Sequence, residues 1–297
     1  MIFATLAVLV AAATSTAAQR PTNTSICDYY TTALLTTNNA TNQYTLLTLL
    51  VNTAVIGNYT QPNHNAVPGI LSANGTFNGT PVNLAPYFSG GLESTNVNGA
   101  ASAVNFLDDG GAAPLMKNMP AAGTTSNQYK LLTHLYSYFG AALGCSTYSE
   151  MGFPAYAGQS SMYSVHKYMG LDANEVGYFI TQVGLSAQSF GVAAADVTAV
   201  GTLLEGVFDV KCAAATTVIP AQGAQLQSIC TADDCPTAAN ASCSAYGTVP
   251  SQPASATGSA SGSRSTSAPA GGSSSGAGAM GVSGLLAGVA AFLTAML

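Results

Sequence analysis

Apolar residues recur at helical spacing in four segments of this chain, where they stand three and four positions apart. That spacing puts the apolar side chains of each segment on one face, so the faces can pack against one another. A short apolar helix is also expected near residues 161–168. The pattern predicts a mostly α-helical bundle, with its main amphipathic helices at residues 41–58, 127–143, 172–190 and 194–210.

Local sequence signals mark where these helices begin. Thr41 or Asn42 is expected to cap the first helix, and Gly57 to end it. Asp172 precedes Glu175 by three positions, which is the spacing of a capping box. The first and second helices start with similar letters, TNQYTLLTLL and SNQYKLLTHL. One solution for a capped amphipathic helix, used twice, explains this similarity more economically than a duplication.

A different pattern fills residues 60–125, which are rich in Gly, Asn, Pro and Thr. Asn-Gly pairs occur at 74–75, 78–79 and 98–99, and such pairs favour tight hairpin turns. Short β-hairpins are therefore expected here, with strands near residues 76–82 and 103–107. An insert of this length is either a functional loop or a glycan-bearing surface.

The two ends read as targeting signals. Residues 1–18 resemble a secretory signal peptide. Residues 249–278 are a Ser/Gly/Ala-rich linker, and the uncharged apolar tail 279–297 follows it. This order predicts a glycosylphosphatidylinositol (GPI) anchor attached within 271–276, and the alternative is a single C-terminal membrane helix. The ectodomain is then 19–248, and its expected location is extracellular, on the plasma membrane or in the cell wall.

Composition narrows the function further. Charged residues make up only 6% of the chain, with six Lys and Arg in total. Nucleic acid is not an expected partner, because its binding needs a cationic surface that displaces counterions. Glycans can hydrate a surface that charge does not. Sequons for N-glycosylation begin at Asn23, Asn39, Asn58, Asn74, Asn78 and Asn240.

The six cysteines favour disulfides. An even number in a secreted chain predicts three bridges, although six cysteines allow 15 pairings. The chain offers no CxxC pair beside a histidine, which argues against a zinc site. The cysteines are Cys27, Cys145, Cys212, Cys230, Cys235 and Cys243.

A set of motifs between residues 127 and 212 resembles the group I truncated haemoglobins. The family shows an aromatic near the end of one helix, a Tyr-x-Gly loop, a Met and the proximal His, and then an acid-capped helix. The corresponding residues in this chain are Phe139, Tyr156-Ala157-Gly158, Met162, His166, Gly170-Leu171 and Asp172.

The resemblance implies haem as the cofactor and His166 as the iron ligand, at a site that binds or reacts with O2, NO or peroxide. His134 would then meet a haem propionate at the rim. Asn52 falls where the family usually has a distal tyrosine. The side chains implied to line the pocket are Leu131, Leu135, Phe139, Met162 and Phe179.

Other readings stay open. His166 can equally be a satisfied core histidine. In that case the chain is a non-enzymatic cell-surface or cell-wall glycoprotein that keeps the fold without haem. The expected partners are the outer leaflet of the plasma membrane, through the anchor, and a cell-wall polysaccharide. A carbohydrate-active enzyme is a third reading. Its acids would come from the insert, where Asp108-Asp109 more readily explains a solvated turn.

Overall fold

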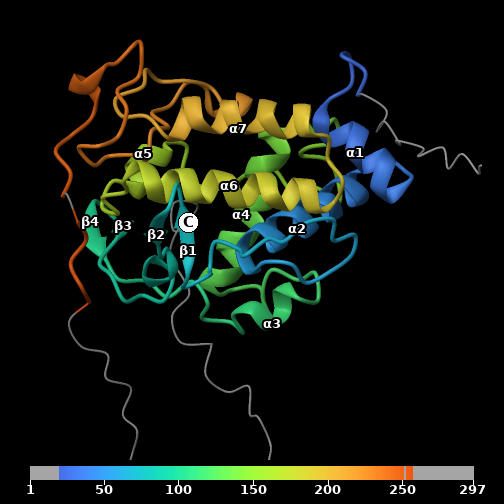
Figure 1. Ribbon diagram of the computed structural model, residues 1–297, viewed down its shortest axis with the longest axis horizontal. Helices are drawn as coiled ribbons and strands as arrows, with labels where there is room; N and C mark the ends of the chain where they lie inside the picture. Colours follow the sequence, from blue (N-terminus) through green and yellow to red (C-terminus); the bar gives the residue numbers. More distant parts are fainter. Residues whose placement is uncertain (1–19, 251, 257–297) are drawn as a thin grey trace, which may run out of the picture.

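The computed structural model describes residues 20–250 and 252–256, which form a mainly helical structure (Figure 1). Two small antiparallel strand pairs accompany the helices. The expected signal peptide, the anchor tail and most of the linker lie outside the described residues. Within the described ranges, no helix is long and apolar enough to cross a membrane.

Seven α-helices are present in the described residues, and the four main predicted helices are confirmed to within two residues at each end. The short helix expected near residues 161–168 is also present. Two helices were not predicted, α1 and α3. The helices are α1 Ile26–Leu35, α2 Ala40–Ile56, α3 Ala112–Leu115, α4 Asn127–Ala142, α5 Met162–His166, α6 Ala173–Ser189 and α7 Ala194–Phe208.

The helix starts differ in how well they follow the sequence signals. The capping box of α6 is confirmed: Asp172 Oδ1 accepts from the Glu175 backbone N–H at 2.8 Å, and Glu175 Oε2 accepts from the Asp172 N–H at 3.2 Å. The predicted cap of α2 was wrong. Asn39 caps this helix, because its Oδ1 accepts from the Asn42 backbone N–H at 2.9 Å. The helix therefore begins earlier, at Ala40.

The core lies between the long helices. α6 packs beside α7 and against α2, and α2 in turn packs on α4 and α1 (Figure 1). Fully buried aliphatic and aromatic side chains fill the space between them, so these helices share one hydrophobic core. The largest contributors include Leu46, Leu47, Leu131, Leu132, Tyr136 and Tyr178.

The insert contains two β-hairpins with the same tip. β1 (Gly75–Phe77) pairs with β2 (Thr80–Val82) around Asn78-Gly79. β3 (Thr95–Val97) pairs with β4 (Ala100–Ser102) around Asn98-Gly99. At both tips the Asn and the Gly have positive φ, as the two-residue turn of a hairpin requires.

Two strand predictions in the insert were wrong in detail. Residues 76–82 do not form one strand, because the Asn78-Gly79 turn folds them into a hairpin. The segment 103–107 is not a strand. Its Phe106 side chain is buried and anchors an irregular segment, while the only bridge here joins Asn105 to Ser89. Between the hairpins lies the short 3-10 helix η1 (Ala85–Tyr87).

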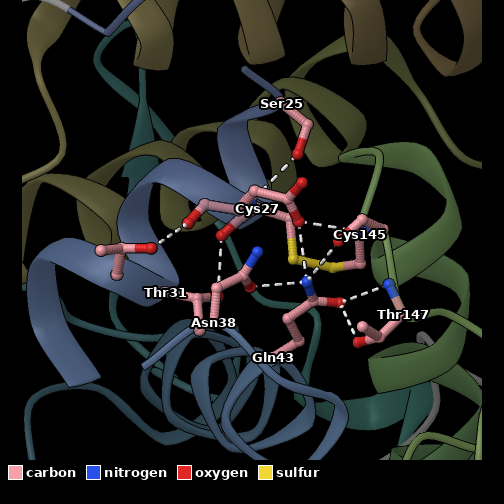
Figure 2. Close-up of a disulfide and its surroundings, with 10 residues drawn as sticks. Ser25, Cys27, Thr31, Asn38, Gln43, Cys145 and Thr147 are labelled. Atoms are coloured by element: carbon pink, nitrogen blue, oxygen red, sulfur yellow. Dashed lines mark hydrogen bonds between the residues drawn. A yellow bond between two sulfur atoms is a disulfide. The ribbon is translucent and has the colours of Figure 1, made fainter. Parts of the chain in front are cut away.

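Three disulfides pair all six cysteines, as predicted: Cys27–Cys145, Cys212–Cys243 and Cys230–Cys235. The first joins α1 to the segment that follows α4, so Cys145 ties the end of that helix to α1. Buried Gln43 lies beside this bridge (Figure 2). Its Nε2 donates to Asn38 Oδ1 at 2.7 Å, and its Oε1 accepts from Thr147 Oγ1 at 2.6 Å. This amide therefore links three segments around the disulfide.

The C-terminal part of the described chain is irregular, with short 3-10 turns η2 (Pro220–Gln222) and η3 (Cys243–Ala245). Its last residues return to the insert. Ser255 forms a bridge with Leu92, and the Glu93 backbone N–H donates to Ala254 O at 2.8 Å. The chain thus leaves the described part beside the start of β3.

Candidate functional site

His166 is the last residue of α5 and is buried, with 6% of its surface exposed. Ser161 caps this short helix, because its Oγ accepts from the Ser164 backbone N–H at 3.1 Å. The ring Nδ1 lies 2.8 Å from the carbonyl oxygen of Met162, one turn earlier. A carbonyl can only accept, so Nδ1 carries a proton. In a neutral imidazole this leaves Nε2 as the nitrogen of the type that binds a metal.

The apolar residues implied for a haem pocket are all buried, but they do not surround one space. Leu135, Phe139 and Phe179 line a small apolar cavity of about 70 Å³ between α1, α2, α4, α6 and α7. Leu131 and Met162 belong to the same hydrophobic core, yet neither they nor His166 line this cavity.

His134 lies on α4 and is half-buried. Its ring meets the ring of Tyr156 edge-on at 5.6 Å, and its Nδ1 has no hydrogen-bond partner among the described residues. Burial, and then the charge of Lys130, lowers the pKa of His134 from 6.5 to about 4. At neutral pH it is therefore uncharged, so it would offer a haem propionate a hydrogen bond and no ion pair.

Asn52 is completely buried and braces three helices. Its Oδ1 accepts from the Tyr136 hydroxyl of α4 at 2.6 Å. Its Nδ2 donates to the Leu115 carbonyl of α3 at 3.1 Å. Both the amide nitrogen and the amide oxygen of Asn52 are thus hydrogen-bonded within the protein, so Asn52 has a structural role.

The fit to haem is therefore mixed. The chemistry of His166 suits an iron ligand. Tyr138 of α4 packs against Tyr156 (5.4 Å between ring centroids) and Phe208 of α7 (6.2 Å). Pockets for drug-sized ligands measure roughly 300–1,000 Å³, several times the apolar cavity that Leu135, Phe139 and Phe179 line.

A second space lies between α5 and the β3–β4 hairpin. This groove measures about 560 Å³, which is within the usual range for ligand pockets. Asn96 holds the β3–β4 hairpin against α5: its Nδ2 donates to Ser164 O at 2.6 Å, and its Oδ1 accepts from the Gly99 N–H at 2.9 Å. The lining comes from residues 95–99 of the hairpin and from Val104, Asn127, Gln159, Ser164, Val165 and Lys167.

The groove is polar but nearly uncharged. Lys167 is its single ionisable side chain, and the Lys167 Nζ sits 4.8 Å from the ring centroid of Tyr168. The Tyr168 hydroxyl donates to the Gly99 carbonyl, which adds a second bond between this region and the hairpin. The side-chain amides of Asn98 and Gln159 make no hydrogen bond within the described ranges. They are therefore available to a ligand.

Sequence reasoning missed this groove. The Asn-Gly pair correctly predicted a turn at residues 98–99, but nothing local connects that turn to α5. The bond from Asn96 to Ser164 spans 68 residues of sequence. The available signal was the cluster of neutral amides in the insert.

Two acids have unusual titration. Burial, and secondarily neighbouring carboxylates, raise the pKa of Glu175 and of Asp209 to about 7. Glu175 is in the first turn of α6, and Asp209 follows α7. Two acids of the insert accept hydrogen bonds from the backbone: Asp108 accepts from the Gln128 backbone N–H at 2.9 Å, and Asp109 accepts from the Gly123 N–H at 2.6 Å. That pair braces backbone at the start of α4.

Comparisons of the chain with protein-family models, with curated proteins and with solved structures found no match. The candidate site therefore rests on the chain's own residues.

Proposed function

We propose that this protein is a non-enzymatic cell-surface or cell-wall glycoprotein that keeps a globin-like helical plan without haem. It presents the groove beside α5 to an extracellular ligand. The observation that carries this proposal is the groove of about 560 Å³ between the β3–β4 hairpin and α5, which is of ligand size and is lined by the Asn98 and Gln159 amides, which make no hydrogen bond within the described ranges.

An extracellular location is supported by covalent chemistry. Three disulfides fit an oxidising compartment, where such bridges form and persist. Most sequon asparagines are exposed, but Asn58 is half-buried and its amide bonds to Asn65 O and to the Val67 N–H. Glycans are therefore proposed at the exposed positions, which are Asn23, Asn39, Asn74, Asn78 and Asn240. Secretion and the lipid anchor remain proposals from the sequence.

A binding role is favoured over catalysis by the groove lining. General acid–base and nucleophilic mechanisms use an ionisable group within reach of a second polar group that activates it. The groove offers Lys167 alone among ionisable side chains, surrounded by amides and valines. Such a lining can orient a ligand through hydrogen bonds without reacting with it.

Haem binding at His166, with O2, NO or peroxide as the ligand or reactant, is the second candidate. It is favoured by one observation, the 2.8 Å contact between His166 Nδ1 and Met162 O, which in a neutral imidazole selects the metal-binding tautomer.

An absorption spectrum distinguishes the two candidates. The chain secreted from a eukaryotic host is mixed with equimolar haemin, beside His166→Ala and His64→Ala variants. His64 is exposed and serves as the control for adventitious ligation. We expect no Soret band above that of His166→Ala. A band at one haem per chain that survives His64→Ala and is lost in His166→Ala would make this a haem protein.

A further inference from the structure

We propose that the groove between the β3–β4 hairpin and α5 binds a neutral saccharide. This inference rests on the proposed function, since it names the ligand class of the surface domain. The groove volume of about 560 Å³ suits a short oligosaccharide segment, because ligand pockets span roughly 300–1,000 Å³.

The hydrogen-bonding groups of the groove match the hydroxyls of a sugar. Each hydroxyl both donates and accepts, and a side-chain amide is the neutral group that also does both. Asn98 and Gln159 are exposed, line the groove and have unused amides in the described part of the chain. Asn96 is already bonded to Ser164 O and to the Gly99 N–H, so it positions the wall that carries Asn98.

The apolar part of the lining completes the match. A sugar ring presents C–H groups on its faces, and these favour contact with apolar side chains over contact with water. Val97 is 41% exposed although it lies within strand β3, and Val104 and Val165 line the same groove. An exposed valine next to unused amides is a combination that a ligand with both C–H faces and hydroxyls would cover.

Charge argues for a neutral ligand. Lys167 is the single ionisable group of the groove, and its ammonium is drawn over the ring of Tyr168, 4.8 Å from the centroid. No acid lines the groove, so a cationic ligand would find no partner there. An acidic polysaccharide would meet one cation where repeated carboxylates call for several.

The distribution of sequons leaves this groove bare. The β1–β2 hairpin carries sequons at Asn74 and Asn78, the second of them at its tip. The β3–β4 hairpin has the same Asn-Gly tip, but Ala100 stands where a sequon would need Ser or Thr. No lining residue of the groove is a sequon asparagine. The chain's own glycans are thus attached elsewhere.

The first test is a binding titration. The secreted chain is titrated by calorimetry with hexasaccharides of β-1,3-glucan, chitin and mannan, and with a polygalacturonate fragment as the acidic comparison. We expect at least one neutral hexasaccharide to bind. Gln159→Ala should weaken it about three- to tenfold, the effect of losing one or two hydrogen bonds. Gln188→Ala changes an exposed glutamine of α6 outside the groove and should leave affinity unchanged.

The second test lets the chain block its own groove. Ala100→Thr completes a sequon at Asn98, and in a glycosylating host the new glycan should abolish binding. Trimming with an endoglycosidase should restore most of the affinity. Ala100→Val adds a β-branched side chain without a sequon and should keep binding.

These outcomes separate this inference from the proposed function. Failure of every neutral hexasaccharide to bind, or binding that survives a fully occupied glycan at Asn98, overturns the saccharide site. The haemin spectrum is unaffected by either result. Binding of the acidic fragment alone, lost in Lys167→Gln, would overturn the neutral ligand class.

Discussion

The two hairpins of the insert have the same Asn-Gly turn but are attached to the rest of the protein in different ways. At the base of the β1–β2 hairpin, a Cβ added to Gly75 would lie 2.6 Å from the Tyr178 ring of α6. At the end of β1, the ring of Phe77 fills the space above Gly177 of α6, where an added Cβ would lie 2.4 Å from the ring. The β1–β2 hairpin is therefore interlocked with α6, in the sense that each element places a ring against a glycine of the other.

The β3–β4 hairpin is held to α5 by polar bonds, from Asn96 to Ser164 O and from Tyr168 to Gly99 O. In Figure 1 it lies beside α5, whereas β1 and β2 lie against α6. Close packing through glycine removes all space between two elements. A few directed hydrogen bonds fix the position of a hairpin and leave a gap beside them. The second arrangement is what produces the groove.

The largest effect expected from this difference is on stability, in Gly75→Ala. The new methyl would meet the Tyr178 ring at 2.6 Å and the backbone oxygen of Val82 at 2.7 Å, and a backbone atom cannot rotate away. Overpacking of this kind should lower the free energy of unfolding by about 2–3 kcal/mol. In guanidinium denaturation this loss of stability should appear as a lower unfolding midpoint, with the dependence of the free energy of unfolding on denaturant concentration unchanged.

Gly206→Ala is the matched control, because a Cβ on that α7 glycine meets nothing within 4 Å. Alanine in a helix should there raise the free energy of unfolding by about 0.5–1 kcal/mol. If Gly75→Ala proved as stable as the parent chain, the β1–β2 hairpin would not be interlocked with α6.

The next largest effect is on how stability depends on pH. Part of it involves α6, the helix that packs against the β1–β2 hairpin. Glu175 precedes Gly177 on α6, and its carboxyl interacts with Tyr87 of η1. Burial raises the pKa of Glu175 from 4.5 to about 7 and that of Asp209 from 3.8 to about 7. A raised folded-state pKa means that the folded chain binds protons more tightly than the unfolded chain. The resulting stability is complete below the unfolded values and is lost as the pH rises through 7.

His134 acts in the opposite direction, because its pKa is lowered from 6.5 to about 4 and its contribution is lost as the pH falls between these values. The two acids outweigh this single histidine, so stability should be highest near pH 4.5, fall as the pH rises to 7, and be lower at pH 8 by about 2 kcal/mol. Half-exposed Asp209 contributes less than Glu175, since water screens it. Urea denaturation across this range measures the curve. Glu175→Gln should flatten its alkaline side, and an unchanged slope in that variant would contradict the assignment.

The sequence predicted the helices better than their surroundings. α2, α4, α6 and α7 carry aliphatic residues at regular spacing, which periodicity detects. α1 was not predicted, because its buried face consists of Cys27, Tyr30 and Thr31, and these residue types do not form an obvious apolar stripe in the sequence. The similar sequences at the starts of α2 and α4 do not correspond to similar caps. Gln43 and Gln128 are both buried, but the caps are Asn39 and Ser126, so the two glutamines lie at different depths in their helices.

The candidate site was less accessible to sequence reasoning. The resemblance to truncated haemoglobins led to His166, and this residue is indeed buried on a short helix. Whether the core leaves room for haem depends on contacts between separate segments, such as those of Tyr138 with Tyr156 and Phe208. The groove depends in the same way on the pairing of Asn96 with α5. Long-range packing of this kind has no local signature.

The smallest stability effect compares the hairpin tips directly. Gly79 and Gly99 have φ of 80° and 89°, and an added Cβ would touch nothing within 4 Å at either tip. Alanine is strained at such φ values whatever the space around it, so Gly79→Ala and Gly99→Ala should each cost about 1 kcal/mol. Because the backbone strain is the same at both tips, the two losses should be of similar size in denaturation curves.

Saccharide affinity should then separate these two variants. Gly99 lines the groove and its carbonyl accepts from Tyr168, so a shifted tip there alters the wall that carries Asn98. Gly79→Ala leaves its sequon intact and lies on the hairpin that is packed on α6. We therefore expect weaker binding in Gly99→Ala alone. Equal weakening in both variants would mean that affinity follows overall stability, and the two hairpins would lose the functional difference that their packing implies.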